Sequence, residues 1–514
     1  MSFLSKSSSH PSAPRAAAIA VIAAAASAAG TVGNTYASTS GTAPVTKAQL
    51  QAEINVLKSQ LSQVRQHENS ASMSSARKVQ VMAIVKEVLA KSKQNSQYMG
   101  SQVQAGYDNG FYIRSAHKAF QLNINGYLQM RYTYSKAAAG NNNTAAGGRA
   151  AGPFGNSSGF DFRRARLILS GNAFKNIIYS ISGDFADGSG PTGLGNTFQI
   201  LDTWIGYEFI PGFMIRAGSI IVPFTHVEYY SAGTEFPEFA AAEAPFDPVR
   251  SLALDAFGNL NKNTLFYDVQ VNNGSKANNL DGSANPTGPG TFQLDNRFGF
   301  YGRIQFAGAG NNNDFMDSPD VAWHKHLVWA IGVAAGYEEQ NSSAGVYPSP
   351  QNSLALIGLA TPGGGFLGGE TASGTMYRAT VDGHVKYRGF AFNSSVYFQQ
   401  YNAATPGAGG STPALYSTYG TGSPWQLGAY GEAGYFLVPH RWELAGRVGD
   451  LTTDGRGKQS MEYTAGVNYY IFGENAKIQT AVTYLPNAAY SSPNIGSVIN
   501  TSDIIGQIQF QVKF

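Results

Sequence analysis

Positively charged side chains recur on one face of segments in which apolar and polar residues alternate. The alternation places ten cations on the polar face: Arg131, Arg164, Arg166, Arg216, Arg297, Arg303, Arg378, Lys386, Arg388 and Arg447. Fewer acids share this face: Asp255, Asp268, Asp382, Glu443 and Glu462. A guanidinium group holds an oxyanion through two parallel hydrogen bonds while it stays partly hydrated. The chemistry that these residues predict is the reversible binding of anions rather than the making or breaking of bonds.

A second group of charges is acidic and lies close together in the chain. Residues 222–248 contain no Lys or Arg, and they carry five carboxylates: Glu228, Glu235, Glu238, Glu243 and Asp247. Electric fields focus where low-dielectric walls approach each other, so an acidic segment at a constriction would oppose the anion preference of the arginines. Pairing of these acids with the arginines would instead leave the constriction near neutral. The sequence leaves both outcomes open.

Residue types that support catalysis or metal binding are few. The chain has no Cys, which excludes disulfides and thiolate sites. It contains no nucleophile elbow, no HExxH zinc motif and no P-loop, so we expect neither an enzyme nor a cofactor. His324 and His326 lie beside Trp323, with Asp320 as the nearby acid. A surface position is favoured here over a metal site, and no metal is expected.

The composition is that of a chain rich in strands and turns. Charged residues make up 13% of the 514 residues, aromatic residues make up 12%, and there are 60 Gly. The charged fraction is low for a soluble globular protein. The mixture suits both the aromatic girdles of a membrane barrel and a soluble all-β protein with many Gly turns. The net charge of +3 is too small to indicate nucleic-acid binding.

Residues 1–37 have the features of a secretory signal peptide. Lys6 and Arg15 precede the Ala-rich apolar stretch Ala16 to Ala29, and small residues follow it. The stretch is short for a membrane anchor, which is the alternative interpretation. Later in the chain there is no continuous apolar run of spanning length. An exported chain that reaches a membrane would therefore cross it as a barrel.

Residues 38–106 are predicted to be a periplasmic linker and coiled-coil segment. Apolar residues follow one another at spacings of four and three: Leu50, Ile54, Leu57, Leu61 and Val64. A second helical stretch is expected from Val79 to about Lys93. This row of apolar residues would form a coiled coil that joins protomers, and we expect three protomers. An amphipathic helix that packs on its own barrel is the alternative.

Residues 107–514 are predicted to form an antiparallel outer-membrane β-barrel of about sixteen strands. Strict alternation begins at Phe120, where Phe120 and Leu122 lie on one face and Gln121 and Asn123 on the other. The predicted strands start near residues 120, 161, 176, 198, 212, 249, 263, 296, 326, 376, 389, 425, 440, 459, 475 and 503. Short and long links alternate between these strands, which is the rim asymmetry of membrane barrels. The link 307–325 is long where a short one is expected, which points to a missed hairpin.

Phe514 lies on the apolar face of the last predicted strand, together with Ile504, Ile508, Phe510 and Val512. A terminal aromatic residue on such a strand is the usual insertion signal for the barrel-assembly machinery. We therefore expect this machinery and outer-membrane lipid among the partners of the chain.

Three short motifs resemble those of the phosphate-selective porin O and P family. They are Phe160 to Leu167, Leu201 to Tyr207, and Ile215 to Gly218 leading to Pro223-Phe224, with an echo at Glu462 to Tyr470. The resemblance spans roughly residues 107–514. It implies a sixteen-stranded trimeric porin whose third long loop folds into the lumen. Family members often carry a Lys just ahead of the Pro-Phe pair, where this chain has Ile220-Ile221-Val222.

The predicted function is passive diffusion of small hydrophilic solutes and ions through a water-filled porin, as a homotrimer in the bacterial outer membrane. A phosphate- or oxyanion-selective channel that uses the lumen arginines is one alternative. A structural envelope tether or adhesin with a plugged barrel is another. Conduction of ions would favour the general porin or the oxyanion-selective channel, whereas a barrel that does not conduct would favour the tether or adhesin.

Overall fold

The computed structural model describes residues 103–137, 156–186, 199–274, 298–340, 374–403, 423–453, 459–489, 497 and 501–514, apart from 109, 116–117 and 231. The predicted signal peptide, the coiled-coil residues Leu50 to Val64 and the predicted lumen residue Arg297 lie outside these ranges. Among the described residues, no helix is both long and apolar enough to cross a membrane.

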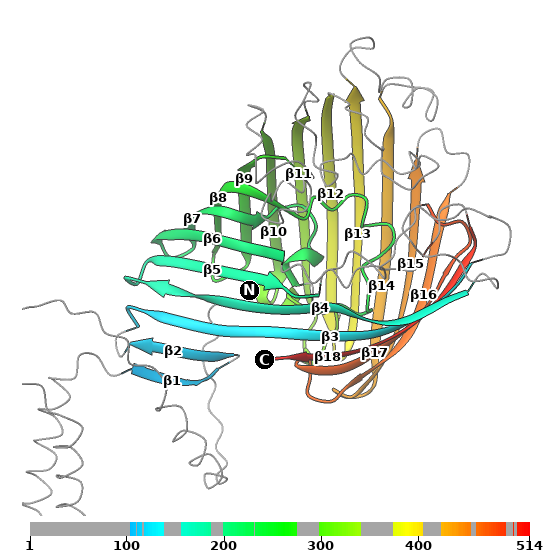
Figure 1. Ribbon diagram of the computed structural model, residues 1–514, viewed down its shortest axis with the longest axis horizontal. Helices are drawn as coiled ribbons and strands as arrows, with labels where there is room; N and C mark the ends of the chain where they lie inside the picture. The colour runs from blue at the N-terminus through cyan, green and yellow to red at the C-terminus, as the bar shows by residue number, and fades with distance from the viewer. Residues whose placement is uncertain are drawn as a thin grey trace, which may run out of the picture. The chain divides into compact units, whose positions relative to one another are not determined.

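Sixteen antiparallel strands close into one barrel (Figure 1). Each strand pairs with the next along the chain, and β18 pairs with β3 from Asp503↔Ala137 to Lys513↔Tyr127. The strands are β3 (Gln121–Ala137), β4 (Asn156–Ala173), β5 (Ile177–Asp184), β6 (Gln199–Ile210), β7 (Phe213–Ile221), β8 (Arg250–Leu260), β9 (Leu265–Asn272), β10 (Gly299–Ala309), β11 (Val328–Gln340), β12 (Gly374–Tyr387), β13 (Phe390–Ala403), β14 (Trp425–Val438), β15 (Trp442–Thr453), β16 (Ser460–Tyr470), β17 (Ala476–Leu485) and β18 (Asp503–Lys513). The predicted count of sixteen is confirmed.

A short hairpin precedes the barrel and was not expected from the sequence. It consists of β1 (Val103–Tyr107) and β2 (Phe111–Ser115). β2 pairs with the first residues of β3, from Gln121 to Ile124. The pairing of β3 with β18 begins only at Tyr127. The hairpin therefore covers the end of β3 that extends past β18.

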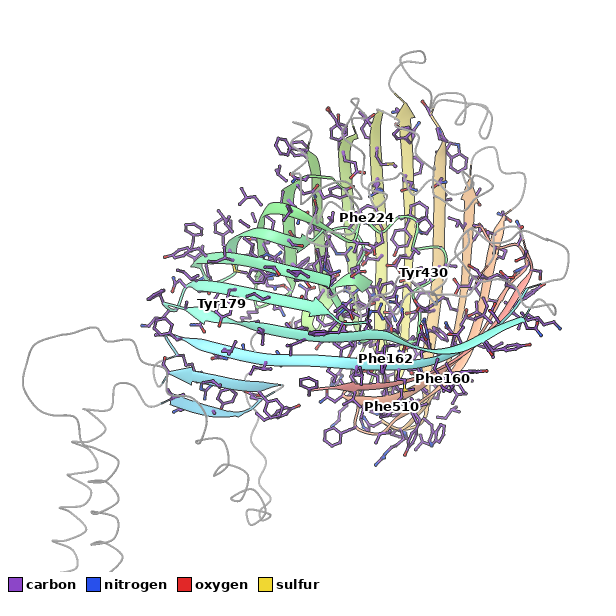
Figure 2. The ribbon with its side chains drawn as sticks, in the orientation of Figure 1. Phe160, Phe162, Tyr179, Phe224, Tyr430 and Phe510 are labelled. Carbon is purple, nitrogen blue, oxygen red and sulfur yellow. The ribbon has the colours of Figure 1, made fainter. Side chains whose placement is uncertain are left out.

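Side chains alternate between the two faces of the wall, as the period of a strand requires. In β12, Arg378, Thr380, Asp382, His384 and Lys386 are buried, whereas Tyr377, Val381 and Tyr387 are exposed. The same outward exposure holds for Phe160, Phe162 and Phe510, which are labelled in Figure 2. An apolar outer face with a polar inner face is the arrangement of a membrane barrel, because a soluble barrel buries its apolar side chains inside.

A β-bulge interrupts this alternation in β4. Gln129 of β3 pairs with Arg164, and the next residue, Met130, pairs with Phe162, so Arg163 has no partner in the ladder. An extra residue in a strand exchanges the inward-facing and outward-facing positions of the residues beyond it. As a result, Asp161 and Arg163 lie on the same side as Arg164.

One rim of the barrel carries short turns, at residues 174–176, 211–212, 261–264, 388–389, 439–441 and 471–475. The link 310–327 between β10 and β11 belongs to this rim but is much longer. It contains no hairpin, so the suggestion of a missed hairpin is wrong. It contains instead one 3-10 turn, η2 (Asn312–Phe315), which begins with a capping box between Asn311 and Asp314.

Candidate solute pathway and its constriction

The segment between β7 and β8, residues 222–249, lies inside the barrel, and we call it L3. It contains the 3-10 turn η1 (Val227–Tyr230). Phe224 and Phe246 of L3 are fully buried and pack with the wall residues Tyr397 and Tyr430. Figure 2 labels Phe224 and Tyr430 in the interior. The rings of Phe246 and Tyr397 are stacked with centroids 5.5 Å apart. L3 is therefore held on β13 and β14 by aromatic packing.

Ion pairs tie L3 to the wall at β3 and β4. The Glu238 carboxylate accepts hydrogen bonds from Arg131 and from Arg163, and Arg131 also binds Asp161. Burial alone would raise the pKa of Glu238, but the guanidinium groups of Arg163 and Arg131 lower it to about 2. Glu238 is therefore ionised at every pH at which the barrel would work.

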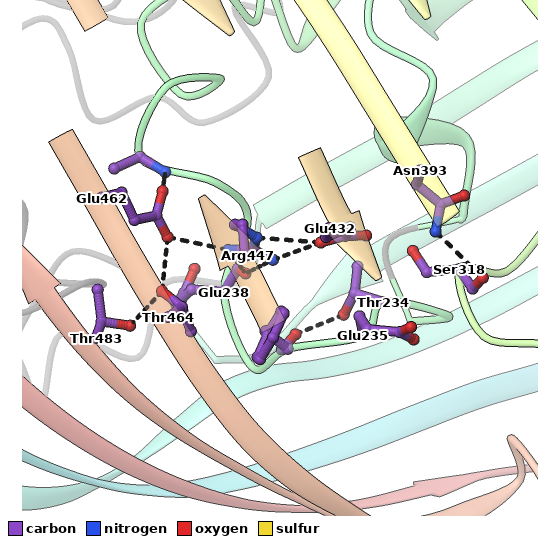
Figure 3. A network of polar contacts seen from close by, with 12 residues as sticks. Thr234, Glu235, Glu238, Ser318, Asn393, Glu432, Arg447, Glu462, Thr464 and Thr483 are labelled. Carbon is purple, nitrogen blue, oxygen red and sulfur yellow. Dashed lines mark hydrogen bonds and ion pairs between the residues drawn. The ribbon is translucent and has the colours of Figure 1, made fainter. Parts of the chain in front are cut away.

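Hydrogen bonds tie the same part of L3 to β15 and β16 (Figure 3). Arg447 donates to the backbone oxygen of Glu238 over 3.1 Å and pairs with Glu432 at 3.0 Å and Glu462 at 3.3 Å. The backbone N–H of Ala241 donates to Glu462 over 2.7 Å. Arg447 thus neutralises two buried wall carboxylates while it fixes the loop backbone.

Further contacts extend from L3 to β16 and β17. The backbone oxygen of Thr234 accepts from Lys477 at 3.0 Å and from Gln479 at 2.7 Å. That of Glu235 accepts from Asn468 at 2.8 Å. Because Glu238 lies against β3 and β4, the segment 234–241 bridges separate parts of the wall. L3 therefore narrows the lumen.

The predicted lumen cations are paired with carboxylates more often than they are free to meet an anion. The pairs within the wall are Arg166–Asp184, Arg216–Asp255, Arg216–Asp268, Arg303–Asp382 and Arg378–Glu338, and Lys386 of the wall pairs with Asp317 of the link 310–327. Arg250 binds both Asp202 and Glu228. Among the described residues, sixteen Asp and Glu are buried against nine Lys and Arg. The inner face therefore does not present the net positive wall that the arginines suggested.

Arg164 differs from the other lumen arginines. It donates to Gln129 over 2.9 Å, and its guanidinium carbon lies 5.2 Å from the centre of the Phe239 ring. It forms no ion pair within the described part of the chain, and its Nε has no hydrogen-bond partner there. Arg164 is thus a buried wall arginine whose charge is not paired with any carboxylate of the described residues.

Arg388 lies outside the inward-facing set. It follows the last residue of β12 and occupies the turn 388–389, where it is exposed with a φ of 47°. Its guanidinium carbon lies 5.2 Å from the centre of the Tyr387 ring. The alternation that placed it in the lumen had been extended one residue past the end of the strand.

Two carboxyl groups meet where L3 approaches β14 and β15. A Cβ atom at Gly434 would lie 2.1 Å from Oε1 of Glu235 and 2.6 Å from Oε1 of Glu443, so any other residue there would displace the ends of these two side chains. Neither oxygen of Glu235 has a hydrogen-bond partner among the described residues. Burial, and then the charge of Glu443, raise the pKa of Glu235 well above its usual value. The site therefore favours the protonated form of Glu235.

The link 310–327 folds inward and meets L3. The N–H of Ser318 donates to the Gly233 oxygen over 2.6 Å, and the hydroxyls of Ser318 and Tyr230 lie 3.4 Å apart. Asn393 of β13 holds the Ser318 carbonyl at 3.2 Å. The lumen is thus occupied from both rims, by L3 and by this link.

The same link carries His324 at the short-turn rim. Oδ1 of Asp314 lies 3.6 Å from Nε2, too far for a hydrogen bond, whereas Asp320 contacts Nδ1 directly. The two carboxylates, Asp314 and then Asp320, raise the pKa of His324 to about 9. His326 is exposed. Asp314 was not foreseen as a neighbour of His324.

Replacing His324 with Gln is expected to flatten the alkaline part of the stability profile. The pKa of His324 is raised from 6.5, so its stabilising charge is fully present below pH 6.5 and is lost as the pH rises through about 9. The loss should be on the order of 1 kcal/mol after allowance for solvent screening. Melting temperatures in detergent from pH 6 to pH 10 test this. Equal slopes for the wild type and His324→Gln would show that another group is responsible.

Three cations that contact L3 were not predicted from the sequence: Arg163, Arg250 and Lys477. Arg163 was not among the predicted lumen residues, because the bulge that turns it inward is not visible in the alternation. Arg250 lies at the first residue of β8, and Lys477 at the second residue of β17. Both are buried. A search for charged residues at strand ends could have found them.

Comparisons with known proteins give one family match. Residues 148–352 match the family model described as phosphate-selective porin O and P. No curated protein matches. An anion-selective porin from Comamonas acidovorans shares 10% identity at a TM-score of 0.45, with 76% of this chain and 99% of that chain covered.

Two further solved structures are similar to the chain. The outer membrane channel DcaP of Acinetobacter baumannii shares 11% identity at a TM-score of 0.44, with 80% of this chain and all of that chain covered. OmpT of Vibrio cholerae, in its trimer form, shares 8% identity at a TM-score of 0.44, with 76% and 99% covered. The family match over residues 148–352 confirms the resemblance to the phosphate-selective porin O and P family.

Proposed function

We propose that the chain is an outer-membrane porin through which small hydrophilic solutes and ions diffuse passively. The observation that carries the proposal is a closed sixteen-stranded barrel with an apolar outer face, a polar inner face and a loop folded into the lumen. The family match supports it, because this family and this fold are those of channels rather than of enzymes.

The ion preference of this porin is weak. Selectivity depends on the width of a pore and on the charges at its narrowest ring. Apart from Arg164, the arginines that contact L3 are neutralised by carboxylates of the loop and of the wall, so neither sign of charge strongly dominates the ring. A general porin follows more directly from this arrangement than a phosphate-specific channel.

Single-channel recording in planar bilayers tests the proposal. The purified full chain is measured under a KCl gradient, with and without phosphate. Ohmic steps with a small reversal potential are the expected result. Small steps that phosphate blocks would identify an oxyanion-selective channel. Absence of conductance would contradict the porin proposal and favour a structural tether or adhesin, for which the contacts of L3 with several parts of the wall are the supporting observation.

The oxyanion alternative rests on Arg164, which has no carboxylate partner among the described residues. Replacing Arg164 with Gln is expected to shift the reversal potential towards cation preference. A unit charge about 4 Å from an ion in water contributes about 1 kcal/mol, which corresponds to about a fivefold change in the permeability ratio. Arg388→Gln, at the exposed turn, is the control and should leave the ratio unchanged. An unchanged ratio for Arg164→Gln would remove the basis of this alternative.

Homotrimeric assembly, the periplasmic position of residues 38–106 and recognition of Phe514 by the barrel-assembly machinery are part of the same proposal. The outward apolar residues of the strands suit contact with lipid and with neighbouring protomers. Mass measurement of the detergent-solubilised protein, with and without residues 38–106, tests the trimer. A monomer in both cases would contradict it.

A further inference from the structure

Two histidines and an aspartate meet where L3 lies against β12. They are His226 of L3 and Asp382 and His384 of β12, and all three are buried. One potential ligand atom from each residue lies within 4.8 Å of the other two. The centres of the two imidazole rings are 4.1 Å apart. The separation of these residues in the chain means that only the fold of L3 brings the cluster together.

The surroundings of His384 and Asp382 orient both side chains. Nδ1 of His384 lies 2.9 Å from Oδ1 of Asn393, whose amide group donates to the Ser318 carbonyl. Nε2 of His384 lies 2.8 Å from Oδ1 of Asp382. Partners of this kind are what a metal-binding imidazole requires, because a bond at one ring nitrogen fixes the ring and leaves the other nitrogen for the ion.

Arg303 serves Asp382 in a similar way. Its Nη1 binds Oδ2 at 2.7 Å and its Nη2 binds Oδ1 at 2.8 Å. A carboxylate that binds a metal through one oxygen commonly keeps a hydrogen bond at the other. Oδ1 can therefore turn to an ion while Oδ2 remains with Arg303.

His226 supplies an independent indication of a ligand. It is only 5% exposed, and its Nδ1 has no hydrogen-bond partner among the described residues. A buried polar atom without a partner costs free energy, so such atoms are rare unless something binds them. The ring is packed against Tyr230 and His384, which keeps it beside the other two side chains.

We propose that His226, Asp382 and His384 bind one divalent ion of the zinc class, with water at a fourth position. Imidazole and carboxylate ligands suit Zn²⁺, Cu²⁺ and Ni²⁺, whereas Mg²⁺ prefers oxygen ligands alone. On binding, the ion replaces the proton between His384 and Asp382, and that proton is released to solvent. Two ligand atoms of a tetrahedral zinc lie roughly 3.4 Å apart. Nε2 of His384 and Oδ1 of Asp382, which are 2.8 Å apart in the structure, would therefore move slightly away from each other.

The charges around the cluster limit the affinity. Arg303 is paired with Asp382, and Lys386 with Asp317, so the nearest cations are neutralised but remain close to the ion. Asp382 is the one carboxylate in the ligand set. We expect micromolar rather than nanomolar binding. The bound ion would link L3 to β12 and so restrict movement of the loop.

Equilibrium dialysis of the purified full chain against ZnCl₂, followed by elemental analysis, tests the site. One zinc per chain is expected, and excess Mg²⁺ should not displace it. His226→Asn and His384→Asn should each weaken binding at least tenfold, whereas His326→Asn, at the exposed rim, should not. This measurement does not depend on conduction, so it stands apart from the test of the proposed porin function.

The fold of each variant is checked by circular dichroism and by its mobility in unheated gels. If His384→Asn fails to fold, His226→Asn still tests the site, because His226 lies in a loop and not in the wall. Loss of zinc by a folded His226→Asn variant supports the proposal. Absence of bound zinc in the wild type, or binding that His226→Asn leaves unchanged, would overturn it.

Discussion

Shortening L3 is expected to raise the single-channel conductance several-fold. Replacement of residues 234–243 by a short Gly-Ser linker removes the segment that joins Glu238 at β3 and β4 to the wall at β15–β17. Conductance rises with the cross-section of the narrowest part of a pore, and we propose that this segment lines that part. Single-channel recording in 1 M KCl, with heat-modifiable gel mobility as the check of folding, measures the effect.

Glu238→Gln is the matched control for this deletion. It keeps the loop and its backbone bonds to Arg447, but it removes the charge that binds Arg131 and Arg163. Its conductance should lie between that of the wild type and that of the deletion. Equal conductance in all three proteins would mean that ions do not pass beside L3, and the proposed constriction would be wrong.

Replacing Arg447 with Met is expected to cost about 3–5 kcal/mol of folding free energy, since it leaves buried charges without a partner. Glu432 and Glu462 both lose their ion pair, and the Glu238 carbonyl loses two hydrogen bonds. Unfolding in detergent, followed by circular dichroism and by gel mobility, measures the loss.

Two further variants separate the charge of Arg447 from its bulk. Arg388→Met removes an exposed arginine and should change stability by about 0.5 kcal/mol or less. The triple variant Arg447→Met, Glu432→Gln, Glu462→Gln removes the stranded charges and should recover much of the loss. Failure of the triple variant to recover would assign the effect of Arg447 to packing against Phe236 and Tyr430.

The alternation of polar and apolar residues was sufficient to predict the wall. In β12, Arg378, Asp382 and Lys386 are buried and Tyr377, Val381 and Tyr387 are exposed, because a strand has one side chain per face every two residues. The exceptions are local and have physical causes. The bulge at Arg163 shifts the inward and outward alternation of β4 by one residue. The turn at Arg388 ends the alternation of β12. Neither event alters the hydrophobic pattern enough to be recognised in a single sequence.

The charge pairs could not be predicted in the same way. Glu238 binds Arg131, 107 residues away, and its backbone binds Arg447, 209 residues away. Sequence supplied both sets of charges but not which acid meets which arginine, because that depends on the path of L3. The cluster of His226 and His384 was missed for the same reason, whereas His324 and His326 were noticed because they are adjacent in the chain.

The seam between β18 and β3 has a consequence for the order in which the protein can be made. Gln511 and Gln129 are hydrogen-bonded across it although 382 residues separate them, and Phe514 exchanges two backbone hydrogen bonds with Gly126. Until β18 arrives, β3 and β17 each present an unpaired edge, and such edges join other chains readily. The side of β3 that pairs with β18 therefore stays open until the last strand of the barrel has been made. Closure of the barrel therefore requires that this edge of β3 pairs with β18 before it pairs with another chain.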